Sequence, residues 1–177
     1  KLLIENARDG VEVRFCFDDV RRRTLPKIFI VELKNEGVEV YNFMPVFFPY
    51  LTGKANFRNH RKIVVIDGEV GYIGGINIAD RYTNRQAHRA FWRDTQLRIV
   101  GEAVKTLQLQ FMLNWNFVSG KQLAIDAKYF PEVRANQNHL VQIAASGPDS
   151  DWPSIMQGIL MAISTAEKYI YITTPYF

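Results

Sequence analysis

The sequence predicts an α/β fold in which a mixed β-sheet is flanked by helices, and the fold is truncated in the chain as given. Three observations lead to this class. β-rich and helical patterns alternate before residue 42, two β-rich runs flank a turn signal within residues 62–73, and an amphipathic helical pattern covers residues 102–115. Elements of these two kinds form layers in which helices bury their apolar faces on the sheet.

The first forty residues contain the pattern strand, helix, strand. Residues 11–17 alternate as a half-buried strand does. Thr24 and Pro26 are residue types that begin a helix, and Gly37 is the type that ends one. Residues 38–41 return to a strand pattern, so we expect a β-α-β unit in this part of the chain.

Aromatic and apolar residues between positions 41 and 51 are interrupted by Pro45 and Pro49. Two prolines this close together disfavour a regular strand or helix. Two interpretations stay open, namely a loop packed on the core and an exposed apolar lip that meets lipid acyl chains.

A hairpin is predicted next. The runs 62–66 and 70–73 flank Asp67-Gly68, a residue pair that favours a tight hairpin turn. Residues 96–100 predict another strand, and apolar residues at helical spacing predict a core helix over 102–115.

Towards the end of the chain we expect a strand over 140–145, a helix over 155–166 and a strand over 169–177. A connector of mixed polarity precedes them. We therefore place one lobe at residues 1–135 and the beginning of a second lobe at residues 136–177.

Composition limits the class of protein. The 177 residues are 47% hydrophobic and 13% aromatic, which is enough for a core and excludes a disordered chain. The net charge of +4 is a modest bias towards anionic partners such as phospholipid headgroups or nucleic acid. A single cysteine excludes an internal disulfide framework, and no apolar run is long enough to span a bilayer. The chain starts at Lys1 and stops within a strand pattern, so we expect a piece of a longer protein.

Chemically active residue types gather around the predicted hairpin. Alternation along the strand puts His60 and Lys62 on one face. Imidazole can act as a nucleophile or a general acid near neutral pH, and an ammonium group can neutralise a phosphate. Asn77 can add a neutral donor to the same phosphate. Gly74 and Gly75 permit a positive φ and a close backbone approach to an anion.

Each of these residues also has an ordinary structural explanation, and Asp67 in particular suits a hairpin turn. The joint spacing argues against coincidence. His-x-Lys-x4-Asp alone is expected in on the order of one per cent of chains of this length. The Gly-Gly-x-Asn that follows lowers this chance by further orders of magnitude.

The pattern His60-x-Lys62-x4-Asp67, followed by Gly74-Gly75-x-Asn77, resembles the HKD motif of the phospholipase D superfamily. Strings along nearly the whole chain resemble bacterial cardiolipin synthases within that superfamily; they lie at residues 36–41, 58–68, 72–75, 91–95, 107–111, 146–149 and 171–177.

The resemblance implies a phosphatidyltransferase. One phosphatidylglycerol transfers its phosphatidyl group to a second through a phosphohistidine, which gives cardiolipin and releases glycerol. His60 is then the nucleophile or its general-acid partner, while Lys62, Asn77 and the backbone at Gly75 bind the phosphate. Asp67 belongs to the catalytic motif and supports it locally.

Asp94 is the expected acceptor for the second ring N–H of His60, because relatives carry an acid at this place and a neutral imidazole needs a fixed tautomer. The alternative is a surface or turn carboxylate. The scheme needs no metal or other cofactor, and the three histidines show no ligand spacing.

Complete relatives contain two HKD motifs, and this chain contains one. The expected partners are phosphatidylglycerol, anionic membrane lipid and the second HKD half of a parent protein at the bacterial cytoplasmic membrane. Nucleic acid is not an expected partner. A homodimer of the fragment stays open, as does insertion of the strand near 168–173 into the place of the first lobe's missing opening strand. The rival functions are a phosphodiesterase or nuclease of the superfamily, and a non-catalytic phosphate-binding fragment.

Overall fold

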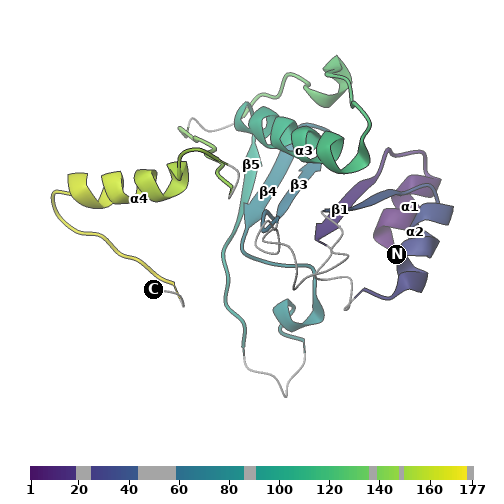
Figure 1. Cartoon of the computed structure of the whole chain (residues 1–177), viewed down its shortest axis with the longest axis horizontal. Helices are drawn as coiled ribbons and strands as arrows, with labels where there is room; N and C mark the ends of the chain where they lie inside the picture. The colour runs from purple at the N-terminus through teal and green to yellow at the C-terminus, as the bar shows by residue number, and fades with distance from the viewer. Residues whose placement is uncertain (19–24, 44–58, 86–90, 136–138, 148–149, 175–177) are drawn as a thin grey trace. The chain divides into compact units, whose positions relative to one another are not determined.

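The computed structural model describes residues 1–18, 25–43, 59–85, 91–135, 139–147 and 150–174. The chain divides into two compact units, residues 1–141 and 142–177, and each is described by itself. Figure 1 labels most of their helices and strands. The apolar segment between positions 41 and 51 lies outside the described residues from residue 44 on, as do the last three residues of the chain.

The first unit begins with α1 (Leu2–Arg8), β1 (Arg14–Asp18), α2 (Lys27–Asn35) and β2 (Glu39–Phe43). β1 and β2 are parallel, so the predicted β-α-β unit is confirmed. The helix α1 was not predicted, because its N-cap residue is Lys1, which makes no side-chain capping bond and gives no sequence signal for a helix start.

The two faces of this parallel pair pack against different helices. Val40 on one face belongs to a buried cluster with Ile4 of α1 and Leu33 of α2. On the other face the Tyr41 ring meets the Trp115 ring edge-on at 5.1 Å between centroids. Trp115 belongs to α3 (Ala103–Ser119), so the sheet lies between α1 and α2 on one side and α3 on the other.

An antiparallel sheet of β3 (Ile63–Ile66), β4 (Val70–Gly74) and β5 (Gln96–Val100) follows in the order β3-β4-β5. The predicted hairpin and both of its strands are therefore confirmed, as are the strand over 96–100 and the core helix. Asp67 and Gly68 form the turn with φ of 54° and 71°, the left-handed values that a type I′ hairpin needs.

The helix α3 also packs on this antiparallel sheet (Figure 1). A Cβ at Gly71 of β4 would overlap Leu107 of α3, so this glycine lets the helix lie close to the strand. Val104 and Leu107 are fully buried there. The predicted α/β class is confirmed, with the strands arranged as a parallel pair and a separate antiparallel sheet.

A connector leaves α3 and passes through the short 3-10 helix η4 (Ala127–Tyr129). Its Lys128 and Tyr129 side chains bond the carboxylate of Glu12, and the Tyr129 hydroxyl lies 2.7 Å from Glu12 Oε2. The Tyr129 carbonyl and Pro131 lie against Gly68, where a Cβ would overlap both. The connector is thus fastened to the hairpin turn and to the segment before β1.

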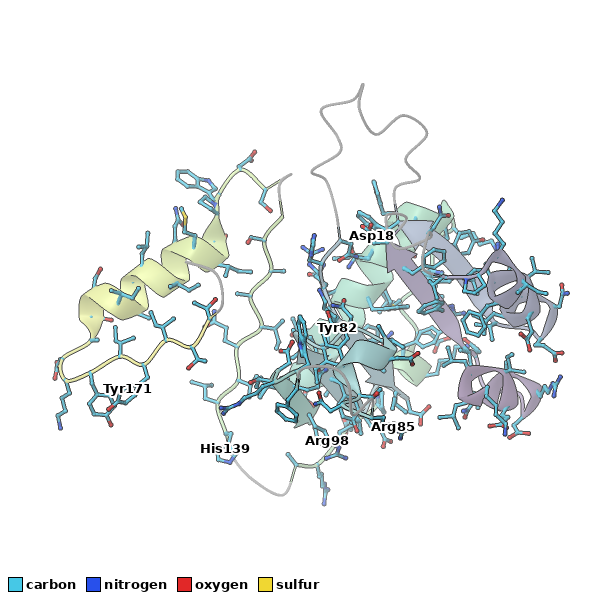
Figure 2. The ribbon with its side chains drawn as sticks, turned by 90° about the horizontal axis from the view of Figure 1, so that it is seen from below. Asp18, Tyr82, Arg85, Arg98, His139 and Tyr171 are labelled. Carbon is cyan, nitrogen blue, oxygen red and sulfur yellow. The ribbon has the colours of Figure 1, made fainter. Side chains whose placement is uncertain are left out.

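The second unit contains α4 (Ser154–Thr165), which confirms the predicted helix. The predicted strands over 140–145 and 169–177 are wrong as far as the structure describes them, to residue 174. A strand needs a second strand to which its N–H and C=O groups can bond. The described residues of this unit contain no strand pair. Tyr171, 87% exposed, lies in the irregular segment after α4 (Figure 2). Among the helices that the structure describes, none has the length and apolar character needed to cross a bilayer.

Candidate active site

The antiparallel order of β3, β4 and β5 brings three chain segments to one edge of the sheet. β3 starts at this edge, β4 ends there and β5 starts there, with Ile63 opposite Ile73 and Gly74 opposite Gln96. The motif residues before β3 and after β4 therefore share an edge with the residues before β5. All predicted site residues except Asp67 lie in these segments.

Alternation across β3 separates the motif from α3. The Arg61 guanidinium bonds Asn114 of α3 at 3.3 Å, and Val65 is paired with Gly71, which faces α3. Residues 62 and 60 alternate with these positions, so Lys62 and His60 belong to the opposite face of the sheet. Val64 on that face is about half exposed.

Local hydrogen bonds fix the backbone around His60. The Asn59 N–H donates to Asp18 Oδ2 at 3.2 Å, and Asn59 Oδ1 accepts from the Arg61 N–H at 3.0 Å. The Lys62 ammonium donates to the His60 carbonyl at 2.6 Å. The His60 side chain itself is exposed.

Asp18 lies at the end of β1 and was not among the predicted site residues (Figure 2). Its only sequence signal was its place at the end of the strand pattern. Its neighbour Cys16 is half-buried, and burial, followed by the charge of Asp18, raises the pKa of this thiol to about 11. The thiol is therefore protonated at neutral pH, as in a structural cysteine.

Gly74 and Gly75 play a different part from the predicted one. Neither has a positive φ, so that expectation is wrong. The Gly75 N–H donates to the Thr95 carbonyl at 3.2 Å, because pairing with the residues before β5 continues past the end of β4. A Cβ at Gly75 would overlap the carboxylate of Asp94. Phosphate binding by Gly75 stays a prediction, with its N–H engaged in this structure.

Asp94 lies directly beside Gly75. Its Oδ1 accepts from the Thr95 N–H at 2.7 Å, and its Oδ2 is 3.5 Å from the Trp92 indole nitrogen. The predicted hydrogen bond between Asp94 and the His60 ring is not formed; the donors to the Asp94 carboxylate among the described residues are the Thr95 N–H and the Trp92 indole N–H. Pairing between β4 and β5 continues as far as Gly75 and Thr95, whereas pairing of β3 with β4 begins at Ile63, after His60 and Lys62.

Asn77 lies at the same edge, and its Nδ2 donates to the Tyr82 hydroxyl at 2.6 Å. Asp67, by contrast, occupies the turn at the far end of β3, separated from Lys62 by roughly 16 Å of extended chain. The structure thus brings His60, Lys62, Asn77 and Asp94 to one edge and leaves Asp67 at the other. The described residues contain no cluster of His, Cys, Asp or Glu that could hold a metal ion.

Three further residues of this edge escaped prediction: Tyr82, Asn84 and Trp92. Tyr82 and Asn84 lie in a polar stretch without periodicity, which gives no local signal. Trp92 belongs to residues 91–95, which resemble the family, but the resemblance does not predict which side chain Trp92 contacts.

Comparisons with known proteins agree with the motif. A family model described as "Cardiolipin synthase, PLD-like domain" matches residues 1–115. The chain is 45% identical over 98% of its length to the cardiolipin synthase of Staphylococcus aureus, and 46% identical over 99% to that of Geobacillus sp.. Cardiolipin synthase 2 of Staphylococcus epidermidis is 44% identical over 99% of the chain.

The chain spans about a third of the length of these relatives, namely 35%, 35% and 36%. No solved structure matches it. Because the family model covers well over half of the chain, the chain belongs to the family of cardiolipin synthases with a phospholipase D-like domain.

Proposed function

We propose that the chain is the first lobe of a cardiolipin synthase with the beginning of its second lobe, and that it supplies one half of an active site for transphosphatidylation. The observation that supports the proposal is the order of the antiparallel sheet, in which the segments that carry His60, Lys62, Asn77 and Asp94 adjoin strand ends at one edge. The family match and the similarity to much longer cardiolipin synthases support it.

The reaction consists of two displacements at phosphorus. A ring nitrogen of one histidine attacks the phosphorus of phosphatidylglycerol, the bond to the glycerol oxygen breaks, and a second histidine gives this oxygen its proton. A hydroxyl of another phosphatidylglycerol then attacks the phosphohistidine and passes its proton to that second histidine. Cardiolipin and glycerol leave, and the enzyme is regenerated. His60 is one of the two histidines, and the other belongs to the second HKD half.

Lys62 is the proposed counter-charge of the phosphate. Its ammonium is bound by a backbone carbonyl, and no carboxylate pairs with it in the part of the chain that the structure describes. The positive charge is therefore not neutralised before an anionic substrate arrives. A lysine so placed stabilises the charge that builds up on the non-bridging oxygens in the transition state.

Asn77 and Asp94 complete the proposed site. An amide nitrogen has two N–H donors, so Asn77 can bond Tyr82 with one and a phosphate oxygen with the other. The role of Asp94 requires the exposed His60 ring to turn towards it. Catalytic hydrogen bonds often form only in the substrate complex. Asp67 supports the hairpin turn, and Gly75 leaves the space that Asp94 occupies.

The proposed partners are phosphatidylglycerol, other anionic lipid of the bacterial cytoplasmic membrane, and the second HKD half.

The test uses the full-length protein that contains these residues, assayed with phosphatidylglycerol in detergent micelles. His60→Ala is expected to lower turnover by more than a hundredfold, since it removes a nucleophile or its acid partner. His139→Ala, outside the site, is the matched control. Turnover above about a tenth of wild type in His60→Ala would contradict the proposal. Phosphodiester cleavage of nucleic acid without lipid turnover would favour the nuclease alternative instead.

A further inference from the structure

The segment between β4 and β5 carries both Asn77 and Asp94. It leaves the sheet after Gly74, forms the 3-10 helix η3 (Asp80–Tyr82), and returns to the sheet at Gln96. Asn77 lies near its beginning and Asp94 near its end. The contacts inside this segment therefore decide how both side chains are presented.

The first contact joins Tyr82 to Asn77. The hydroxyl of Tyr82, which Figure 2 labels, accepts a hydrogen bond from Asn77 Nδ2 at 2.6 Å, and both residues are half-buried. Local backbone bonds hold the tyrosine in place, because its N–H donates to the Ala79 carbonyl at 3.0 Å. One amide N–H of Asn77 is thereby fixed in direction, which fixes the plane of the amide and the direction of its second N–H.

The second contact holds Tyr82 from the part of the segment that returns to the sheet. The Tyr82 ring meets the Trp92 ring edge-on, at 4.8 Å between centroids and 70° between planes. Aromatic pairs prefer this arrangement. Trp92 is itself anchored by Asn84, which donates to its carbonyl at 2.8 Å and accepts from its N–H at 2.7 Å.

Asn84 makes these two bonds from a left-handed backbone conformation, with φ of 55°. Asparagine tolerates this conformation better than most residues do. The Trp92 indole nitrogen then lies 3.5 Å from Asp94 Oδ2. A continuous series of contacts thus runs from Asn77 through Tyr82 and Trp92 to Asp94.

We propose that Tyr82 is a positioning residue for Asn77, and that Trp92, anchored by Asn84, holds the Tyr82 ring in its place. This inference rests on the proposed function and adds a residue to it. Tyr82 touches no substrate in this scheme. Its hydroxyl keeps the free N–H of Asn77 directed to a phosphate oxygen, so that the amide does not have to be ordered when the transition state forms.

The test is a double-mutant cycle on kcat/KM for phosphatidylglycerol in the full-length protein. Tyr82→Phe removes the hydroxyl and keeps the ring, and we expect about a tenfold loss, the size of one hydrogen bond. In an Asn77→Ala background the same change is expected to have almost no further effect, because a residue that acts through Asn77 has nothing left to position. A role in folding alone would instead give losses that multiply.

Tyr129→Phe is the matched control, since it removes a hydroxyl that bonds Glu12 away from the site. We expect it to keep kcat/KM. Thermal unfolding of all variants shows whether Tyr82→Phe is folded, and Trp92→Leu, which removes the ring contact, is expected to reproduce part of its loss. Wild-type activity in Tyr82→Phe, or multiplicative losses in the cycle, would overturn the inference. A fully active His60→Ala would overturn the proposed function instead, so the two failures are distinguishable.

Discussion

The carboxylate of Asp18, at the end of β1, accepts the backbone N–H of Asn59, the residue before His60. This bond joins the parallel pair to the segment that leads into the antiparallel sheet. The exposed His60 side chain has its backbone fixed by a residue about forty positions earlier in the chain.

Asp18→Ala is expected to lower kcat/KM of the full-length protein by about tenfold, because a charge-assisted hydrogen bond to the segment before His60 is lost. Asp18→Asn keeps an acceptor oxygen and is expected to recover most of the rate. Steady-state kinetics of both variants is the measurement. Equal losses in the alanine and asparagine variants would contradict a role of the acceptor oxygen.

Lys62→Ala is expected to reduce turnover nearly as much as loss of His60, since the phosphate then lacks its main counter-charge. Lys62→Arg keeps the charge and is expected to retain more activity than the alanine variant. Lys105→Ala, which removes the partner of Glu102 at the start of α3, is the control and should keep its turnover. Comparable activity of Lys62→Ala and wild type would show that another group binds the phosphate.

Gly75→Ala is expected to destabilise the chain by about 1 kcal/mol, because the added Cβ overlaps the exposed Asp94 carboxylate, which must then turn away from the Thr95 N–H. Asp94→Ala removes the three atoms that lie nearest to this Cβ. The double variant is therefore expected to be more stable than the sum of the two single changes predicts. Urea unfolding measures all three variants, and strict additivity would contradict the close approach.

Stability is expected to depend on pH through Glu12. Hydrogen bonds from Lys128, Tyr129 and Arg14, in this order of size, lower the pKa of the Glu12 carboxyl from its ordinary 4.5 to about 2. A carboxyl group with a lower pKa in the folded than in the unfolded chain stabilises the fold at pH values above its unfolded-state pKa. This contribution is lost as the pH falls from 4.5 towards 2.

Glu12→Gln should therefore lower the free energy of unfolding at pH 7 by about 1 kcal/mol or less, since the carboxylate is about half exposed. The difference from wild type should shrink at pH 3. Urea unfolding at both pH values is the measurement. Glu132→Gln, at a position without an ion pair in the described residues, serves as the control. If the difference in the free energy of unfolding between Glu12→Gln and wild type grew as the pH fell, the prediction would be contradicted.

The 177-residue chain alone is expected to make no cardiolipin unless two copies associate. It carries one HKD histidine, and the double displacement needs two on opposite sides of one phosphorus. Light scattering gives the mass in solution, and the micelle assay gives the turnover of the same sample. Turnover by a strictly monomeric chain would contradict the two-histidine mechanism.

Most elements of the first unit could be predicted from local sequence signals. Alternation predicted the strands, Asp67-Gly68 predicted the hairpin turn, and apolar spacing predicted α3; each of these signals acts over a few residues. The strands expected over 140–145 and 169–177 have the same local signal, but strand formation depends on a partner that this chain does not supply in the described residues. Propensity alone cannot report that absence.

The site was predicted in part for a similar reason. Spacing identified His60, Lys62 and Asn77, and the strand order explains why they share an edge. The contacts of Tyr82 with Asn77 and of Asn84 with Trp92 arise when a polar segment folds back on itself. No periodicity encodes such contacts, so the sequence offered no means of finding them.

Strand β3 lies between the turn residue of the motif, Asp67, and the two motif residues that precede the strand, His60 and Lys62. One end makes the turn that sets the pairing of the hairpin, and the other end presents Lys62 and His60 away from α3. Because side chains alternate with a period of two, one inserted residue inside β3 would rotate the segment before it to the face that the helix covers. Two inserted residues would restore the face and move it by about 7 Å along the strand direction. Whether the number of residues between His60 and Asp67 is odd or even therefore decides on which face of the sheet His60 lies. The number itself decides only how far His60 lies from the turn.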